Sequence, residues 1–237
     1  DDYIAQLLKQ CQEHHVDILL PGLDDDAHII SRSADRFREQ GIEVLVSDAE
    51  LVSVCRDKVK ICNLLHEVTD SFCESFTREN YRGALDCGKL HYPFIAKPAD
   101  GSGSQGVKII NDESFLHLIE ANACVQELVA PRPDDPCAGE FWKQVERHVV
   151  SQVSEVSVEI VTSRNGELIG RMATCNRLKN GVPIEILPFE DEALWEEIDI
   201  LLPVLKEMGL RGPMNIQGRI TENGVRFFEL NPRFTGI

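Results

Sequence analysis

Hydrophobic residues in the first part of the chain recur at two different spacings. Apolar residues three and four apart occur over residues 3–14 and again over residues 24–41, which predicts two helices. Each stretch is followed by a compact apolar run, at residues 16–20 and 42–46, which predicts two strands. Helices and strands that alternate with short turns predict parallel pairing with right-handed crossovers. Because an open parallel sheet normally holds more than two strands, we expect part of a domain whose first strands are missing.

The pattern over residues 48–129 predicts a series of short elements. We expect helices at residues 51–55, 57–66 and 112–121, a strand and a helix within residues 67–90, and a strand at 124–129. Two further apolar runs, at residues 93–96 and 107–110, flank a loop that is rich in glycine.

Strand signals dominate after Ser151. Apolar residues approach strict alternation over residues 153–161, and Arg164-Asn165-Gly166 is typical of a hairpin turn. The remaining expected elements are strands at 168–175 and 182–187, a helix at 191–208, and a hairpin of 213–220 with 225–230. Residues 130–150 interrupt the pattern with prolines and mixed charges, which predicts a surface insertion with at least one helical turn.

Composition and charge narrow the classes of function. Of 237 residues, 43% are hydrophobic and 27% are charged, and no apolar run approaches the roughly 20 residues of a membrane span. We therefore expect a cytoplasmic globular protein, long enough to be an enzyme, that does not act at a membrane. The net charge of −16 would repel a phosphate backbone, which argues against nucleic acid as a partner. The eight cysteines form no C-x-x-C pair and are expected to be reduced, mostly buried thiols.

The glycine-rich loop carries the clearest chemical signal. Gly101, Gly103 and Gly106 form G-x-G-x-x-G, a pattern of dinucleotide-binding loops, and an acid, Glu127, lies about twenty residues further on. That motif requires a helix to begin at the loop, so that the helix dipole faces the pyrophosphate. Here the loop leads into Val-Lys-Ile-Ile followed by Asn-Asp, which predicts a short strand and a turn. We therefore expect the loop to join two strands as a hairpin.

Lys97 stands directly before this loop, in the preceding apolar run. Backbone N–H groups without bulky side chains can approach phosphate oxygens closely, and an ammonium group neutralises phosphate charge. The combination favours a site for the phosphates of a nucleotide. The alternative is a surface hairpin with a solvated lysine.

Four polar residues near the end of the chain suggest a metal site. Glu229, Asn231 and Arg233 are spaced two apart, as on one face of an extended strand, and Gln217 lies on the partner strand of the hairpin. Oxygen atoms of Glu, Asn and Gln suit Mg²⁺, which takes few protein ligands. An arginine beside them can hold a transferring phosphoryl group. The alternative is an ordinary polar strand end.

Two further sets of residues carry less information. The backbone of residues 126–129 could pair with an adenine edge, with Glu155 on ribose hydroxyls, although both are also ordinary strand residues. Arg171, Arg177 and Lys179 lie on or after a strand and could bind an anionic substrate. A solvated strand end explains these three cations equally well.

In their order and spacing, these segments resemble the ATP-grasp superfamily, most closely the branch similar to the large chain of carbamoyl phosphate synthetase. The matching segments are residues 19–25, 55–59, 92–98, 101–106, 125–129, 215–217 and 228–234. The resemblance implies an α/β (α+β) ATP-grasp fold. It would consist of a partial Rossmann-like N-terminal domain (residues 1–47) and two α+β lobes that sandwich ATP (48–125 and 126–237).

The resemblance also implies a role for each matching position. Contacts to ATP are implied for Lys58, Lys97, Gly101, Ser102, Gly103, Ser104, Gly106, Glu127, Leu128, Val129 and, on the ribose, Glu155. Gln217, Glu229 and Asn231 would bind Mg²⁺ or Mn²⁺, and Arg233 together with Lys97 would act on the phosphoryl group. Two features depart from the family pattern: the insertion at residues 130–151 and two ends that look truncated.

The implied function is an ATP- and Mg²⁺-dependent ligase. Such an enzyme activates a carboxylate as an acyl phosphate, which an amine, a thiol or another nucleophile then attacks. Its partners would be small-molecule carboxylates and nucleophiles, with Arg171, Arg177 and Lys179 as candidate substrate contacts, and a homodimer is left open. The alternative from a different class is a non-catalytic, ATP-binding regulatory module.

Overall fold

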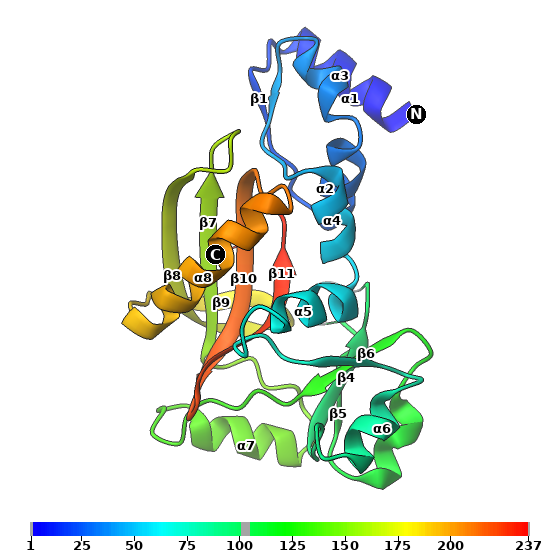
Figure 1. Ribbon diagram of the computed structural model, residues 1–237, viewed down its shortest axis with the longest axis vertical. Coiled ribbons are helices and arrows are strands. Elements are labelled where there is room, and N and C mark those ends of the chain that lie inside the picture. Colours follow the sequence, from blue (N-terminus) through cyan, green and yellow to red (C-terminus); the bar gives the residue numbers. More distant parts are fainter. Residues whose placement is uncertain (1, 101–104, 237) are drawn as a thin grey trace.

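Three separate sheets organise the computed structural model, which describes residues 2–100 and 105–236 (Figure 1). The first belongs to a small N-terminal unit. Its elements are α1 (Asp2–Glu13), β1 (Ile18–Leu19), α2 (Asp24–Ser31), α3 (Ala34–Arg38) and β2 (Glu43–Val44). The two strands pair in parallel, as predicted. The core of this unit is formed by apolar residues at helical spacing, among them Ile4, Ile30 and Phe37.

The single helix expected over residues 24–41 was wrong in one respect, because the structure divides it into α2 and α3. Ser33 leaves the helical conformation, with φ −124° and ψ 11°, and its N–H donates to the carbonyl of Ile30. Serine hydroxyls compete with helical backbone hydrogen bonds, so a helix ends readily near such residues.

The second part of the fold contains a four-stranded antiparallel sheet of order β3-β6-β4-β5. Its strands are β3 (Ser75–Thr77), β4 (Phe94–Pro98), β5 (Lys108–Ile110) and β6 (Ala123–Glu127). Its helices are α4 (Ala49–Cys55), α5 (Lys58–His66), α6 (Tyr81–Asp86) and the 3₁₀ helix η1 (Glu113–Leu118). Because β4 pairs with β5, the glycine-rich loop joins two antiparallel strands, as predicted.

Two expectations for this part need correction. The helix expected over residues 112–121 is the shorter 3₁₀ helix η1, whose N-cap Asp112 accepts a hydrogen bond from the N–H of Ser114. The expected boundary between residues 125 and 126 falls inside β6. Since β6 pairs with β3 and β4 along its length, the whole strand belongs to the four-stranded sheet.

The third part is a five-stranded antiparallel sheet of order β11-β10-β7-β8-β9. Its elements are α7 (Ala138–Glu146), β7 (Glu155–Thr162), β8 (Leu168–Lys179), β9 (Val182–Pro188), α8 (Glu192–Glu207), β10 (Gly212–Thr221) and β11 (Gly224–Asn231). The long helix α8 crosses one face of this sheet (Figure 1). Asp191 begins it by accepting a hydrogen bond from the N–H of Leu194.

Strand alternation gives this sheet two different faces. Val156, Val158 and Ile160 of β7 are buried in one cluster with the apolar side of α8. The residues between them, Ser157 and Glu159, therefore point to the opposite face, toward the four-stranded sheet. Ser157 and Glu159 of β7 thus lie on the face that α8 leaves uncovered.

The two larger sheets are joined through α5 and the segment after it. The Phe72 and Phe227 rings lie 5.2 Å apart, and Cys73 donates its N–H to the carbonyl of Phe227. The insertion at residues 130–150 contributes to this junction as well. Phe141 and Val145 of α7 are buried in a cluster with Ile109, so this segment has a packed inner side as well as a surface.

The cysteines and the lengths of the helices bear on two expectations from the composition. All eight cysteines lie in the described part of the chain and are free thiols, five of them buried. Among residues 2–100 and 105–236, no helix has the length and apolar character needed to cross a membrane.

Candidate functional site

A cavity between the two larger sheets brings together residues from distant parts of the chain. It is lined by Lys58, Ile95, Lys97, Pro98, Gln105, Val107, Ile109, Glu127, Leu128, Val129, Val150, Ser151, Glu155, Arg219, Phe228 and Glu229. Seven of these were predicted as site residues from the sequence. Gly101, Ser102, Gly103 and Ser104 lie outside the described residues, whereas Gly106 follows them with a φ of +74°. Because L side chains rarely adopt that conformation, glycine is required at this turn.

Two lysines lie at the side of the cavity where the glycine-rich loop begins. Lys97, on β4, is 6% exposed, and its Nζ donates to the carbonyl of Phe228 at 2.9 Å. Lys58 begins α5, directly after the N-cap Asp57, and its Nζ lies 3.6 Å from Oε1 of Glu229. The two ammonium groups come from different elements, so the tertiary fold is what places them at one cavity.

Arg219 is a buried residue of the cavity that sequence reasoning missed. Its guanidinium donates to Glu155 Oε1 at 2.8 Å and to the carbonyls of Ser151, Val153 and Val129 at 2.8 to 3.1 Å. Burial raises the pKa of Glu155, which the positive charge of Arg219 opposes. Arg219 lies two residues after Gln217 on β10, so strand alternation was the one signal that could have indicated it.

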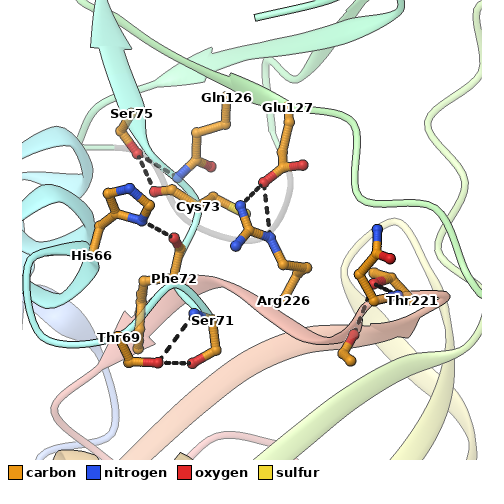
Figure 2. Close-up of polar contacts among 12 residues, drawn as sticks. His66, Thr69, Ser71, Phe72, Cys73, Ser75, Gln126, Glu127, Thr221 and Arg226 are labelled. Atoms are coloured by element: carbon orange, nitrogen blue, oxygen red, sulfur yellow. Dashed lines mark hydrogen bonds and ion pairs between the residues drawn. The ribbon is translucent and has the colours of Figure 1, made fainter. Parts of the chain in front are cut away.

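The predicted adenine-binding segment lies at the end of β6. Figure 2 shows Glu127 accepting hydrogen bonds from Arg226 of β11, with Nε at 3.0 Å and Nη2 also in contact. The preceding residue, Gln126, is fully buried and donates to Oγ of Ser75 at 2.7 Å (Figure 2). These contacts fix the end of β6, so the following residues, Leu128 and Val129, enter the cavity wall from a defined position.

The three predicted metal ligands share the uncovered face of the five-stranded sheet. Gln217 and Glu229 are direct partners across the β10–β11 ladder, and Asn231 pairs in the same way with Asn215. Their donors are carboxylate and amide oxygens, which fit a hard cation such as Mg²⁺. Among the residues that the structure describes, no three His, Cys, Asp or Glu side chains form a metal-binding group. A cation here would therefore depend on water and ligand oxygens for the rest of its coordination.

Arg233 follows β11 and forms a contact that the sequence did not predict. Its Nε and Nη2 donate to Oδ1 and Oδ2 of Asp24 at 2.6 and 2.8 Å. Asp24 is the first residue of α2, so the structure begins this helix at the residue expected from the sequence. Because 209 positions separate Asp24 from Arg233, no sequence pattern indicated that the two residues are partners.

Comparisons with known proteins support this arrangement at the level of the fold. No protein-family model matches the chain. The biotin carboxylase domain of Hydrogenobacter thermophilus 2-oxoglutarate carboxylase, solved with MgADP, ADP and bicarbonate, superposes with a TM-score of 0.70. The identity is 13%, over 98% of this chain and 51% of that chain. The chain has the ATP-grasp fold.

Two other ATP-grasp structures superpose over most of the chain. The Staphylococcus aureus N5-carboxyaminoimidazole synthetase with ADP gives a TM-score of 0.69 at 16% identity, over 98% of this chain and 57% of that chain. The VanG D-Ala:D-Ser ligase of Enterococcus faecalis gives 0.62 at 19% identity, over 92% of this chain and 64% of that chain. The overall fold of the chain is thus shared with proteins of different names.

Two proteins with similar sequences match this chain over a small part of their own length. The uncharacterized protein y4rH of Sinorhizobium fredii is 30% identical over 158 residues, which are 62% of this chain and 30% of that protein. The carbamoyl phosphate synthase large chain of Agathobacter rectalis is 22% identical over 202 residues, 82% of this chain and 18% of that protein. The chain therefore spans less than a third of the length of either relative.

The three cations predicted as substrate contacts do not meet at the ATP-grasp cavity. Arg171 pairs with Ile160 on the α8 side of the sheet, where it lies 4.5 Å from the centre of the Trp195 ring and contacts Asp199. Arg177 donates to Glu140 at 2.7 Å, and Lys179 is exposed at the end of β8. The strand register of Arg171 directs its side chain away from the cavity, and a substrate contact for this residue stays a prediction.

Glu159 is a further buried acid on the uncovered face, which the sequence reading did not single out. Its Oε1 accepts hydrogen bonds from the N–H and the hydroxyl of Thr235 at 3.2 and 2.8 Å. Burial raises the pKa of Glu159 to about 7, although the Thr235 donors act in the opposite direction. The folded protein therefore binds a proton at Glu159 more tightly than the unfolded chain does.

This raised pKa makes a testable difference to stability. Because the folded state holds the proton more tightly, ionisation of Glu159 destabilises the fold as pH rises from about 4.5 to about 7. Relative to Glu159→Gln, the wild-type free energy of unfolding should fall by about 1–3 kcal/mol between pH 5 and pH 8. Urea denaturation of both proteins at the two pH values measures this. If wild type and Glu159→Gln differ in free energy of unfolding by the same amount at pH 5 and at pH 8, the pKa of Glu159 is not raised.

Proposed function

We propose that the chain carries the ATP- and Mg²⁺-dependent site of a ligase that activates a carboxylate as an acyl phosphate for attack by an amine or another nucleophile. The observation that carries this proposal is the convergence on one cavity of the loop-flanking Lys97, the end of β6 and Glu229. The structures that share the fold include complexes with MgADP and with ADP, and their names include carboxylases and a ligase. The acceptor substrates remain part of the proposal.

In this proposal, residues of α5, β4, β7 and the segment at the end of β6 bind the nucleotide. Lys97 and Lys58 neutralise phosphate charge, because both ammonium groups lie at the loop side of the cavity. The glycine-rich loop would cover the phosphates. The segment formed by Glu127, Leu128 and Val129 meets the adenine edge, and Glu155 holds the ribose through the oxygen that Arg219 does not use.

Residues of the five-stranded sheet would act on the phosphoryl group. Gln217, Glu229 and Asn231 would hold Mg²⁺ by oxygen atoms, and the bound ion would supply positive charge that neutralises the phosphates. Arg233 stabilises the charge that spreads over the transferring phosphoryl oxygens. The protein itself forms no covalent bond in this scheme. Its residues bind, orient and neutralise the reacting groups.

Calorimetry with MgATP and a turnover screen test this function. We expect MgATP to bind with a dissociation constant in the micromolar to low millimolar range. ADP and phosphate should be released when the correct carboxylate and nucleophile are present in the screen. Failure to bind MgATP at millimolar concentration would contradict the proposal. Tight binding without turnover for any acceptor would favour the non-catalytic regulatory module.

A further inference from the structure

The contact between α2 and the end of β11 links the N-terminal unit to the proposed reaction site. Asp24 and Arg233 form a bidentate pair in which two nitrogens of the guanidinium meet the two carboxylate oxygens at 2.6 and 2.8 Å. Only 28% of the Asp24 side chain and 15% of the Arg233 side chain are exposed. A bidentate pair that is largely shielded from water fixes the plane of the guanidinium as well as its position.

The same carboxylate lies at the predicted metal ligands. Asp24 lines a small cavity together with Lys58, Glu229 and Asn231. Asp24 therefore binds the candidate phosphoryl-binding arginine and lines the same small cavity as two of the candidate Mg²⁺ ligands. An acid with a purely structural role in the N-terminal unit has no need of either neighbour.

The remaining nitrogen of Arg233 is also engaged. Its Nη1 donates to the carbonyl of Phe234 at 3.1 Å. Contacts at all three nitrogens leave the guanidinium one orientation, so that no rearrangement is needed when charge develops on a ligand nearby. Without the carboxylate, the long side chain would regain several rotamers.

The neighbouring acid provides a natural comparison. Asp25 is also in the first turn of α2 and also binds an arginine, since Arg56 Nη1 donates to its Oδ1 at 2.7 Å. The Asp25 side chain is 79% exposed, however, and that of Arg56 is 33% exposed. The two acids thus share a helix position and a type of partner, and they differ in what the partner is proposed to do.

We propose that Asp24 is a positioning residue for Arg233, so that the N-terminal unit supplies an essential part of the phosphoryl-transfer site. This inference rests on the proposed ligase function. Asp24 binds one edge of the guanidinium, formed by Nε and Nη2. The second N–H group of each terminal nitrogen is left to donate to oxygens of the transferring phosphoryl group. It makes no contact with substrate in this role.

Steady-state kinetics of Asp24→Asn and Asp25→Asn with MgATP and the acceptor found by the screen test the inference. Asp24→Asn should lower kcat by about tenfold to a hundredfold, as expected for a misplaced catalytic group, and change the KM for MgATP less than threefold. Asp25→Asn should have wild-type kcat and KM. If Asp24→Asn does not fold, Asp24→Glu, which keeps the charge and moves it by one methylene, takes its place: its kcat should lie below that of the wild type and of Asp25→Asn, and a wild-type kcat would overturn the positioning role.

A second measurement does not depend on the acceptor. Binding of MgADP should be equal in the wild type and both variants, whereas orthovanadate, a mimic of the transferring phosphoryl group, should bind to the MgADP form of Asp24→Asn at least fivefold more weakly. If the contact were purely structural, Asp24→Asn would not lower kcat selectively over the KM for MgATP. It would also bind orthovanadate as tightly as the wild type.

The possible failures can be told apart. If wild type turns over and Asp24→Asn matches Asp25→Asn in kcat and vanadate binding, the positioning role is wrong and the ligase function stands. An increase of kcat in Asp24→Asn would likewise overturn positioning, because Asp24 would then restrain Arg233 unproductively. If the wild type does not bind MgATP, both the ligase function and the inference that rests on it are overturned.

Discussion

Replacing Glu229 by Gln is expected to lower kcat by at least about a hundredfold while the protein remains folded. The substitution keeps the shape of the side chain and removes one negative charge from the proposed Mg²⁺ ligands. It also removes the ionic partner of Lys58, whose Nζ lies 3.6 Å away. ADP release measured over a range of Mg²⁺ concentrations should show both the lower kcat and a weaker response to the metal.

A matched control for this variant lies in the same hairpin. Glu222 is exposed in the turn between β10 and β11, and Glu222→Gln removes the same charge without approaching the cavity. Its kcat should equal that of the wild type. Circular dichroism and thermal unfolding establish that both variants are folded. Near-normal turnover in Glu229→Gln would disprove its assignment as a metal ligand.

Replacing Arg219 by Ala is expected to lower the free energy of unfolding by about 3–5 kcal/mol. Arg219 is 6% exposed, and its removal leaves the buried Glu155 carboxylate without its partner. Three backbone carbonyls, those of Val129, Ser151 and Val153, lose a donor at the same time. Urea denaturation of the variant at neutral pH measures the loss.

The control for this prediction is an arginine in a solvated ion pair. Arg38 contacts Asp35 at 3.0 Å within α3, and the two side chains are 37% and 89% exposed. Arg38→Ala should cost at most about 1 kcal/mol. The double variant Arg219→Met with Glu155→Leu should recover part of the stability, because apolar residues of similar volume need no charged partner. If Arg219→Ala and Arg38→Ala lower the free energy of unfolding equally, the buried pair contributes no more to stability than the solvated pair.

Sequence patterns predicted the long elements of the fold more accurately than the short ones. The antiparallel strands β7, β8, β10 and β11 and the helix α8 repeat their apolar spacing over many residues, so each carries its own signal. The break between α2 and α3 and the 3₁₀ form of η1 involve only a few residues. Tertiary packing and local side-chain bonds decide such short segments, and the spacing of apolar residues says little about them.

The candidate site shows the same division. Lys97, Glu229 and Asn231 were indicated by local motifs: a glycine-rich loop and polar residues two apart on a strand. Arg219 lies in no local motif. Asp24 lies in the matching segment 19–25, but that segment indicated no partner for it. The partners of the two residues are 64 and 209 positions away along the chain. Arg171 was singled out from the sequence for its charge alone. Its strand register places the side chain on the α8 side of the sheet, away from the cavity.

By itself, the sequence determined the alternation of helices and strands and the hairpin at the glycine-rich loop. It also determined which residue types are available for a phosphate site at that loop and for a metal site near the end of the chain. These features depend on neighbours within a few residues, where spacing and backbone preference act directly. The tertiary structure decided that the two sheets face one another across a cavity, that Glu155 pairs with Arg219, and that Asp24 pairs with Arg233. The physical reason is that a charged side chain in a shielded position must find its partner wherever the fold brings one, and distance along the chain does not limit that choice.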